Sequence, residues 1–117
     1  MLLFSAKTAE AQSIERVRFA SGATAATVRG TLKGNVSRYR DYIVRARAGQ
    51  QMSLEFSGAT KAEFVVFDSN EENLSFAVKE WTGELPETGD YRLRVILNRA
   101  FARRGVQTSY VLNISVR

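Results

Sequence analysis

Two segments near the end of the chain alternate apolar and polar residues, and this pattern constrains the fold more than any other feature. The first runs over residues 90–97 and the second over residues 108–117. A period of two residues is typical of a β-strand that buries one face. We predict that the two strands pair as a long antiparallel hairpin and build the core. The residues expected to point inward are Tyr91, Leu93, Val95, Leu97, Tyr110, Leu112, Ile114 and Val116.

The connection between these segments, residues 98–107, carries the most concentrated positive charge of the chain. Arg99, Arg103 and Arg104 all lie within it. A hairpin needs only about two to five loop residues, so turning the chain does not by itself explain a connection of this length. Residues 99–104 have adequate helix propensity. A single helical turn there would place Arg99 and Arg103 on the same face, four residues apart.

Short alternating segments separated by turn residues continue through the rest of the chain. Residues 41–47 and 51–56 predict a second hairpin. Residues 63–67 are apolar on both faces, which favours a strand in the middle of a packed layer, and residues 74–81 suggest two short strands with a bend. We therefore predict an all-β fold, an antiparallel β-sandwich of about seven to nine short strands with little helix. A closed barrel is the alternative.

The length of 117 residues fits a single domain, which we place at residues 14–117. Residues 1–13 begin with a short apolar run, and Ala9 and Ala11 flank Glu10 in the small-x-small form of a signal peptidase site. We interpret residues 1–13 as a leader or signal-peptide remnant without ordered structure, which predicts export. The apolar run is far too short to span a bilayer, so no membrane insertion is expected.

Composition argues against several kinds of chemistry. The chain has no cysteine and no histidine, which removes thiol nucleophiles, disulfides, Cys/His zinc sites and histidine acid–base catalysis. The carboxylates fall mostly in loops and on outward strand faces, so we expect no enzyme activity, small-molecule substrate, metal or cofactor. Most aromatic side chains are predicted to be core, leaving Phe101 alone beside the arginines, so nucleic acid is not an expected partner either.

The net charge is +5, and arginine outnumbers lysine. Because the guanidinium group pairs with carboxylates and phosphates in bidentate geometry, such a surface suits an anionic partner. The arginine-rich connection is therefore a candidate surface for a partner that presents carboxylates.

A series of residues between Glu15 and Arg117 is similar to a known family. It comprises Val17, Phe19, Gly22, Gly30, Lys33, Gly34, Asp41, Tyr42, Gly49, Gln50, Leu85, Pro86, Gly89, Tyr91, Arg94, Val95, Arg99, Ala102, Arg103 and Tyr110. These residues resemble the periplasmic inhibitors of g-type lysozyme from Gram-negative bacteria. Gly49, Gln50 and residues 85–91 also resemble bacterial pre-peptidase C-terminal β-sandwich domains, so they bear on the fold more than on the function. The discriminating part is residues 94–103, which contain the two arginines four residues apart.

The resemblance implies a β-sandwich that blocks the lysozyme cleft, with Arg99 and Arg103 as the inhibitory contacts. It also implies a tyrosine from the connection after Gly34, which is longer here than in the family. Tyr39 is the nearest tyrosine, and Arg38 is an alternative contact.

Arg104 and Phe101, from the arginine-rich connection, complete the predicted partner-binding set. The expected function is inhibition of g-type lysozyme in the periplasm, which would protect peptidoglycan. The alternative hypothesis is a non-catalytic binding module for carbohydrate or cell-wall polymer.

Overall fold

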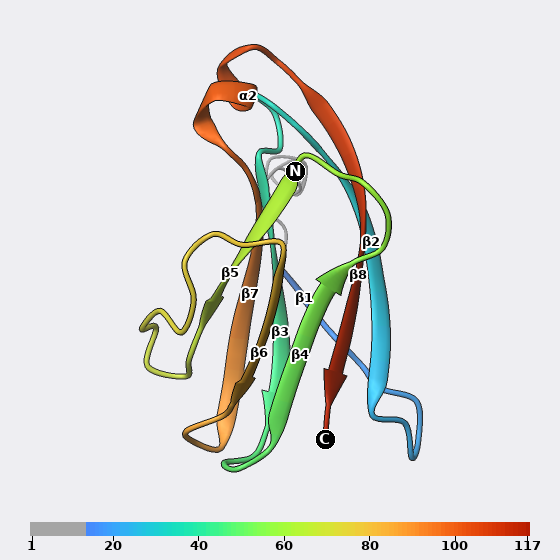
Figure 1. The fold of residues 1–117 in the computed structure, drawn as a ribbon, viewed down its shortest axis with the longest axis vertical. Coiled ribbons are helices and arrows are strands. Elements are labelled where there is room, and N and C mark those ends of the chain that lie inside the picture. The colour runs from blue at the N-terminus through green and yellow to red at the C-terminus, as the bar shows by residue number, and fades with distance from the viewer. Residues whose placement is uncertain (1–13) are drawn as a thin grey trace, which may run out of the picture.

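The computed structural model describes residues 14–117, which form two four-stranded β-sheets packed face to face (Figure 1). Sheet A has the strand order β1-β3-β7-β5, and sheet B has the order β2-β8-β4-β6. The predicted β-sandwich with little helix is confirmed, and two separate sheets replace the barrel alternative. The elements are β1 (Ile14–Arg16), β2 (Ala25–Lys33), β3 (Tyr39–Ala46), β4 (Gln51–Phe56), β5 (Ala62–Phe67), β6 (Glu80–Glu84), β7 (Gly89–Leu97), α2 (Arg99–Arg103) and β8 (Gln107–Val116).

Both predicted hairpins are wrong, because successive strands lie in opposite sheets. β7 pairs with β3 and β5 in sheet A, whereas β8 pairs with β2 and β4 in sheet B. The same holds for β3 and β4, and every connection from β1 to β8 crosses between the sheets. Alternation shows that one face of a strand is buried, but it does not show which strand lies alongside. Here the inward faces of β7 and β8 meet across the core instead of standing side by side.

Three further strand predictions are modified by the sheet topology. β1 pairs in parallel with β3, so the sandwich is not wholly antiparallel. β5 stands at the end of sheet A rather than in the middle of a layer. Its outer edge is met by two isolated bridges, from Val78 to Phe64 and from Asn73 to Phe67, which protect an otherwise free edge. The region predicted as two short strands, residues 74–81, supplies only the Val78 bridge and leads into β6.

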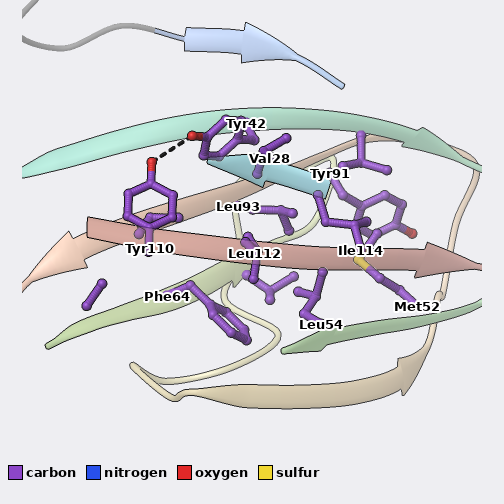
Figure 2. Packing of buried hydrophobic residues seen from close by; sticks show 14 of the residues in the cluster. Val28, Tyr42, Met52, Leu54, Phe64, Tyr91, Leu93, Tyr110, Leu112 and Ile114 are labelled. Carbon is purple, nitrogen blue, oxygen red and sulfur yellow. Dashed lines mark hydrogen bonds between the residues drawn. The ribbon is translucent and has the colours of Figure 1, made fainter. Parts of the chain in front are cut away.

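The core lies between the sheets and is built from the inward residues of the alternating segments (Figure 2). All eight inward residues predicted for the last two strands are buried. At the centre of one end, the hydroxyl groups of Tyr42 (β3) and Tyr110 (β8) form a hydrogen bond of 2.6 Å. This bond joins sheet A to sheet B inside the core. Burial raises the pKa of Tyr110, so the pair stays protonated at ordinary pH.

The predicted leader, residues 1–13, lies outside the described residues. Across residues 14–117, no helix has the length and apolar character needed to cross a bilayer.

The tyrosine pair predicts a specific pattern of stability changes. Tyr42→Phe is expected to lower the free energy of unfolding by about 1–3 kcal/mol, because the hydroxyl of Tyr110 then stays buried without its partner. The double variant Tyr42→Phe/Tyr110→Phe should lose less than the sum of the two single variants, since it leaves no unpaired hydroxyl. Urea unfolding of the four proteins measures this. Full additivity would show that the hydroxyls act independently.

Candidate functional site

The arginine-rich connection between β7 and β8 contains one helical turn, α2, as the sequence predicts. Asn98 caps its start: the side-chain oxygen accepts a hydrogen bond of 3.0 Å from the backbone N–H of Phe101. The backbone carbonyl of Asn98 accepts a further bond of 2.9 Å from the N–H of Ala102. An asparagine at this position satisfies an N–H group that the first turn of a helix leaves free.

The end of α2 is closed by a glycine. Gly105 adopts a left-handed conformation with φ of 70°, which a residue with a side chain rarely adopts. Its N–H donates to the carbonyl of Ala102, and the N–H of Val106 donates to the carbonyl of Phe101, both at 3.1 Å. This pair of bonds is a Schellman motif. Hydrogen bonds therefore hold both ends of this short helix in place.

The inner face of α2 rests on the end of β2. Ala102 is buried against Gly34, where a Cβ atom would collide with the carbonyl oxygen of Ala102 and lie 2.7 Å from its Cα. The N–H of Gly34 also donates to the carbonyl of Val106 at 3.0 Å. Phe101 packs against the hydrophobic core beside this contact. The position of the helical turn therefore depends on the absence of a side chain at residue 34.

The outer face of α2 presents the arginines to solvent. Arg99 and Arg103 are exposed and stand four residues apart on this turn. Neither forms a salt bridge with another residue of the described range 14–117. Arg104 is also exposed, and its guanidinium carbon lies 5.5 Å from the centre of the Phe101 ring. The turn thus offers positive charge that no carboxylate within the described chain neutralises.

The connection between β2 and β3 lies at the same end of the sandwich, as Figure 1 shows. Its last residue, Arg38, is exposed, and its carbonyl accepts a hydrogen bond of 2.9 Å from the N–H of Leu97, just before α2. Tyr39 follows as the first residue of β3 and is half-buried. The guanidinium carbon of Arg94 lies 4.2 Å from the centre of the Tyr39 ring, within the range of a cation–π contact. Five of the six residues predicted to bind a partner therefore lie in these two adjoining connections, and Tyr39 follows directly after one of them.

Sequence reasoning missed a charge cluster below Tyr39, on the outer face of sheet A. Asp41 is buried and accepts hydrogen bonds from Arg94 at 2.8 and 2.9 Å and from Arg92 at 3.1 Å. The hydrogen bond to Asp41 raises the pKa of Arg94 further above its usual value. Asp41 stands directly opposite Arg94 in the β3–β7 register. The signal was present as opposite charges on outward strand positions, but it is visible only once β3 is paired with β7.

Comparison with known proteins identifies the family of this chain. No family sequence profile matches the chain, and no curated protein matches it by sequence. Among solved structures, the chain is similar to Aeromonas hydrophila PliG, described as a periplasmic lysozyme inhibitor of g-type lysozyme. The TM-score is 0.80 and the sequence identity 32%, over 91% of this chain and 97% of that chain. The chain belongs to the periplasmic inhibitors of g-type lysozyme.

Other solved structures share this fold at lower identity. Salmonella Typhimurium PliG is 28% identical with a TM-score of 0.71, over 90% of this chain and 98% of that chain. A PliG mutant from Escherichia coli is 24% identical with a TM-score of 0.73, over 90% of this chain and 98% of that chain, and shows the shared fold. The pre-peptidase C-terminal domain of a Bacillus anthracis collagenase is 13% identical with a TM-score of 0.55, over 89% of this chain and 94% of that chain. It also shows the fold alone.

The PliG proteins are described as inhibitors, so the expectation that this chain is not an enzyme is confirmed. The resemblance identified from the sequence is confirmed as well. That Arg99, Arg103 or the other four residues contact a partner stays a prediction.

Substitution of Gly34 tests how the inhibitor holds α2 in place. Gly34→Ala is expected to displace α2 and to lower the free energy of unfolding by about 1–3 kcal/mol, because the added methyl group overpacks the contact with Ala102. Denaturant unfolding and the amide NMR shifts of residues 99–105 measure the two effects. Gly49→Ala is the control, since Gly49 has a positive φ but no atom within 4 Å of the added Cβ. It should strain its own turn and leave the shifts of α2 unchanged. Unchanged α2 shifts in Gly34→Ala would show that the contact between Ala102 and Gly34 does not hold α2 in place.

Proposed function

We propose that this protein inhibits a g-type lysozyme in the periplasm by placing the exposed turn α2 in the active-site cleft of the enzyme. The observation that carries the proposal is the 32% identity to Aeromonas hydrophila PliG over 91% of the chain. The geometry of α2 adds a physical reason, since it holds two exposed arginines on one face of a capped helical turn. We further propose that residues 14–117 are sufficient for inhibition.

Charge complementarity explains why arginines suit this target. Glycoside hydrolases use a pair of carboxyl groups that flank the scissile bond in a partly desolvated groove. A guanidinium group binds a carboxylate through two parallel hydrogen bonds, which are stronger than neutral ones. Arg99 and Arg103 have no salt-bridge partner among residues 14–117, so binding would not first require breaking an ion pair to one of those residues. Occupation of the groove by the turn excludes the peptidoglycan strand.

Preorganisation of α2 adds to the expected affinity. Ordering a flexible loop or side chain on binding costs free energy that is subtracted from the interaction. The cap by Asn98, the Schellman motif at Gly105 and the contact of Ala102 with Gly34 order this turn before any partner arrives. Within α2, the arginine side chains are then what remains to be ordered when the complex forms.

The alternative of a carbohydrate-binding module has less support. A groove of about 1080 Å³ lies on the outer face of sheet B, and its lining includes hydroxyl and amide side chains together with Glu55, Glu80 and Arg117. Several of these groups bond to one another, as Thr27 does to Asn113 at 3.0 Å and Thr82 to Ser53 at 3.2 Å. They are therefore partly satisfied without a ligand. The likeness to the collagenase domain, at 13% identity, concerns the fold alone.

A turbidity assay tests the proposed function. A suspension of bacterial cell walls clears when lysozyme cuts peptidoglycan, and we expect this protein to prevent clearing by a g-type lysozyme. Clearing by c-type and i-type lysozymes, run in parallel, should be unaffected. Unimpeded clearing by g-type lysozyme, together with sedimentation of the protein with the cell walls, would favour the binding module instead.

Alanine substitution in α2 tests the mechanism separately. Arg99→Ala and Arg103→Ala are each expected to weaken lysozyme binding by about 2–4 kcal/mol, the cost of truncating a buried interfacial charge. Their unfolding free energies should stay near that of the wild type, because exposed charges add little to stability. Calorimetric titration gives the affinities.

Arg47→Ala is the matched control, because Arg47 is an exposed arginine in the β3–β4 connection at the opposite end of the sandwich. It should bind lysozyme as the wild type does. Wild-type inhibition by the Arg99→Ala/Arg103→Ala double variant would remove α2 from the mechanism.

A further inference from the structure

The outer face of sheet A carries a network of charges centred on one buried carboxylate. Asp41 belongs to β3, which lies between β1 and β7, and its side chain points away from the core. That side chain is nevertheless only 4% exposed. Arg94 and Arg92 from β7 cover it. Arg92 also forms a salt bridge with Glu71 in the β5–β6 connection. By contrast, Asp90 on the same face holds Arg16 with a side chain that is 41% exposed. Burial of a charge is costly unless it is fully paired, so the arrangement around Asp41 needs a reason.

Arg94 connects this carboxylate to the candidate binding site. Its Nε and one terminal nitrogen donate to the two oxygens of Asp41 at 2.8 and 2.9 Å. This two-point contact fixes the plane of the guanidinium group as well as its position. The same group lies over the ring of Tyr39, with its central carbon 4.2 Å from the ring centre. The orientation that Asp41 imposes on Arg94 is therefore the orientation in which Arg94 stacks on Tyr39.

Arg92 braces the carboxylate from the other side. It donates to one oxygen of Asp41 at 3.1 Å while its guanidinium carbon lies 4.3 Å from the centre of the Phe67 ring. Two arginines, each stacked on an aromatic ring, thus hold Asp41 between them. The carboxylate accepts three hydrogen bonds, which leaves it little freedom to rotate.

We propose that Asp41 is a positioning residue for the inhibitor, which locks Arg94 on the ring of Tyr39 and so presents Tyr39 to the lysozyme beside α2. That the partner is a lysozyme rests on the proposed function. That Asp41 positions Tyr39 rests on the contacts of residues 39, 41 and 94. Without the carboxylate, Arg94 loses the partner that sets its plane, and the Tyr39 ring loses its stacked neighbour. Tyr39 would then have to be ordered at the moment of binding, which weakens the complex.

The first experiment examines the free protein and does not depend on lysozyme. In the wild type, NMR should show cross-relaxation between the side-chain protons of Arg94 and the ring protons of Tyr39. Asp41→Asn should abolish these contacts, because an amide cannot accept both hydrogen bonds of the arginine fork. Asp90→Asn is the matched control, because it breaks an arginine pair on the same face that does not touch Tyr39. It should leave the contacts intact. Persistence of the contacts in Asp41→Asn would overturn the proposal.

The second experiment is a double-mutant cycle on lysozyme affinity. Asp41→Asn should weaken binding about tenfold in the wild-type background, a size common for residues that share one network. In the Tyr39→Ala background the same change should weaken binding less than about twofold, because the side chain it positions is gone. Asp90→Asn should have little effect in either background. An equal loss from Asp41→Asn in both backgrounds would show that Asp41 acts on stability or on another contact, and would overturn the proposal.

The two experiments separate the two claims. If the wild type does not bind g-type lysozyme, the proposed function fails, while the NMR contacts still decide whether Asp41 holds Arg94 on Tyr39. If the wild type binds and the cycle is additive, the function stands and the positioning role fails. Should Asp41→Asn fold poorly, Arg94→Lys takes its place in the affinity cycle, because lysine keeps the charge but lacks the planar fork. It should weaken binding in the wild-type background and not in the Tyr39→Ala background, and an equal loss in both would overturn the proposal.

Discussion

The structure depends on one constraint: each strand from β1 to β8 lies in the opposite sheet from the strand before it. All connections therefore run across the ends of the sandwich, and the core is closed only when strands distant in sequence come together. The hydrogen bond between Tyr42 and Tyr110 joins the sheets at the end that carries the β2–β3 and β7–β8 connections. Because those connections start from strands that face each other across a packed core, they meet at one end of the molecule. The candidate site is formed where these two connections come together.

Crossing between sheets does not by itself explain the length of the β7–β8 connection. The β3–β4 connection makes a similar crossing with only residues 47–50. The additional residues of the longer one form a helical turn with a cap at each end and a contact with Gly34. This turn buries Ala102 and leaves its arginines exposed, so its order comes from the inner face and its charge is available on the outer face. Such a division suits a surface that must bind without first rearranging.

Much of this architecture was predictable from local patterns. Alternation identified the strands and the inward residues, because the side-chain period of a β-strand is two whatever its partner. The helical turn was predictable from propensity, and the arginine pair on it from spacing. The strand partners were not predictable, and both expected hairpins proved wrong. For that reason the Asp41 network was also missed, since Asp41 and Arg94 are neighbours only through the β3–β7 register.

The sequence by itself determined that the chain is an all-β protein without cysteine or histidine chemistry, and that it carries an arginine pair on a connection longer than a turn requires. These properties follow from composition and from periods of two to four residues, which act over short distances along the chain. Only the tertiary structure decided that Gly34 packs against α2 and that Arg38 and Tyr39 adjoin this turn. It also decided that the buried carboxylate of Asp41 holds the arginine that lies over Tyr39. Those relations depend on which strands pair and on which residues meet across the core, and a local pattern carries no record of either.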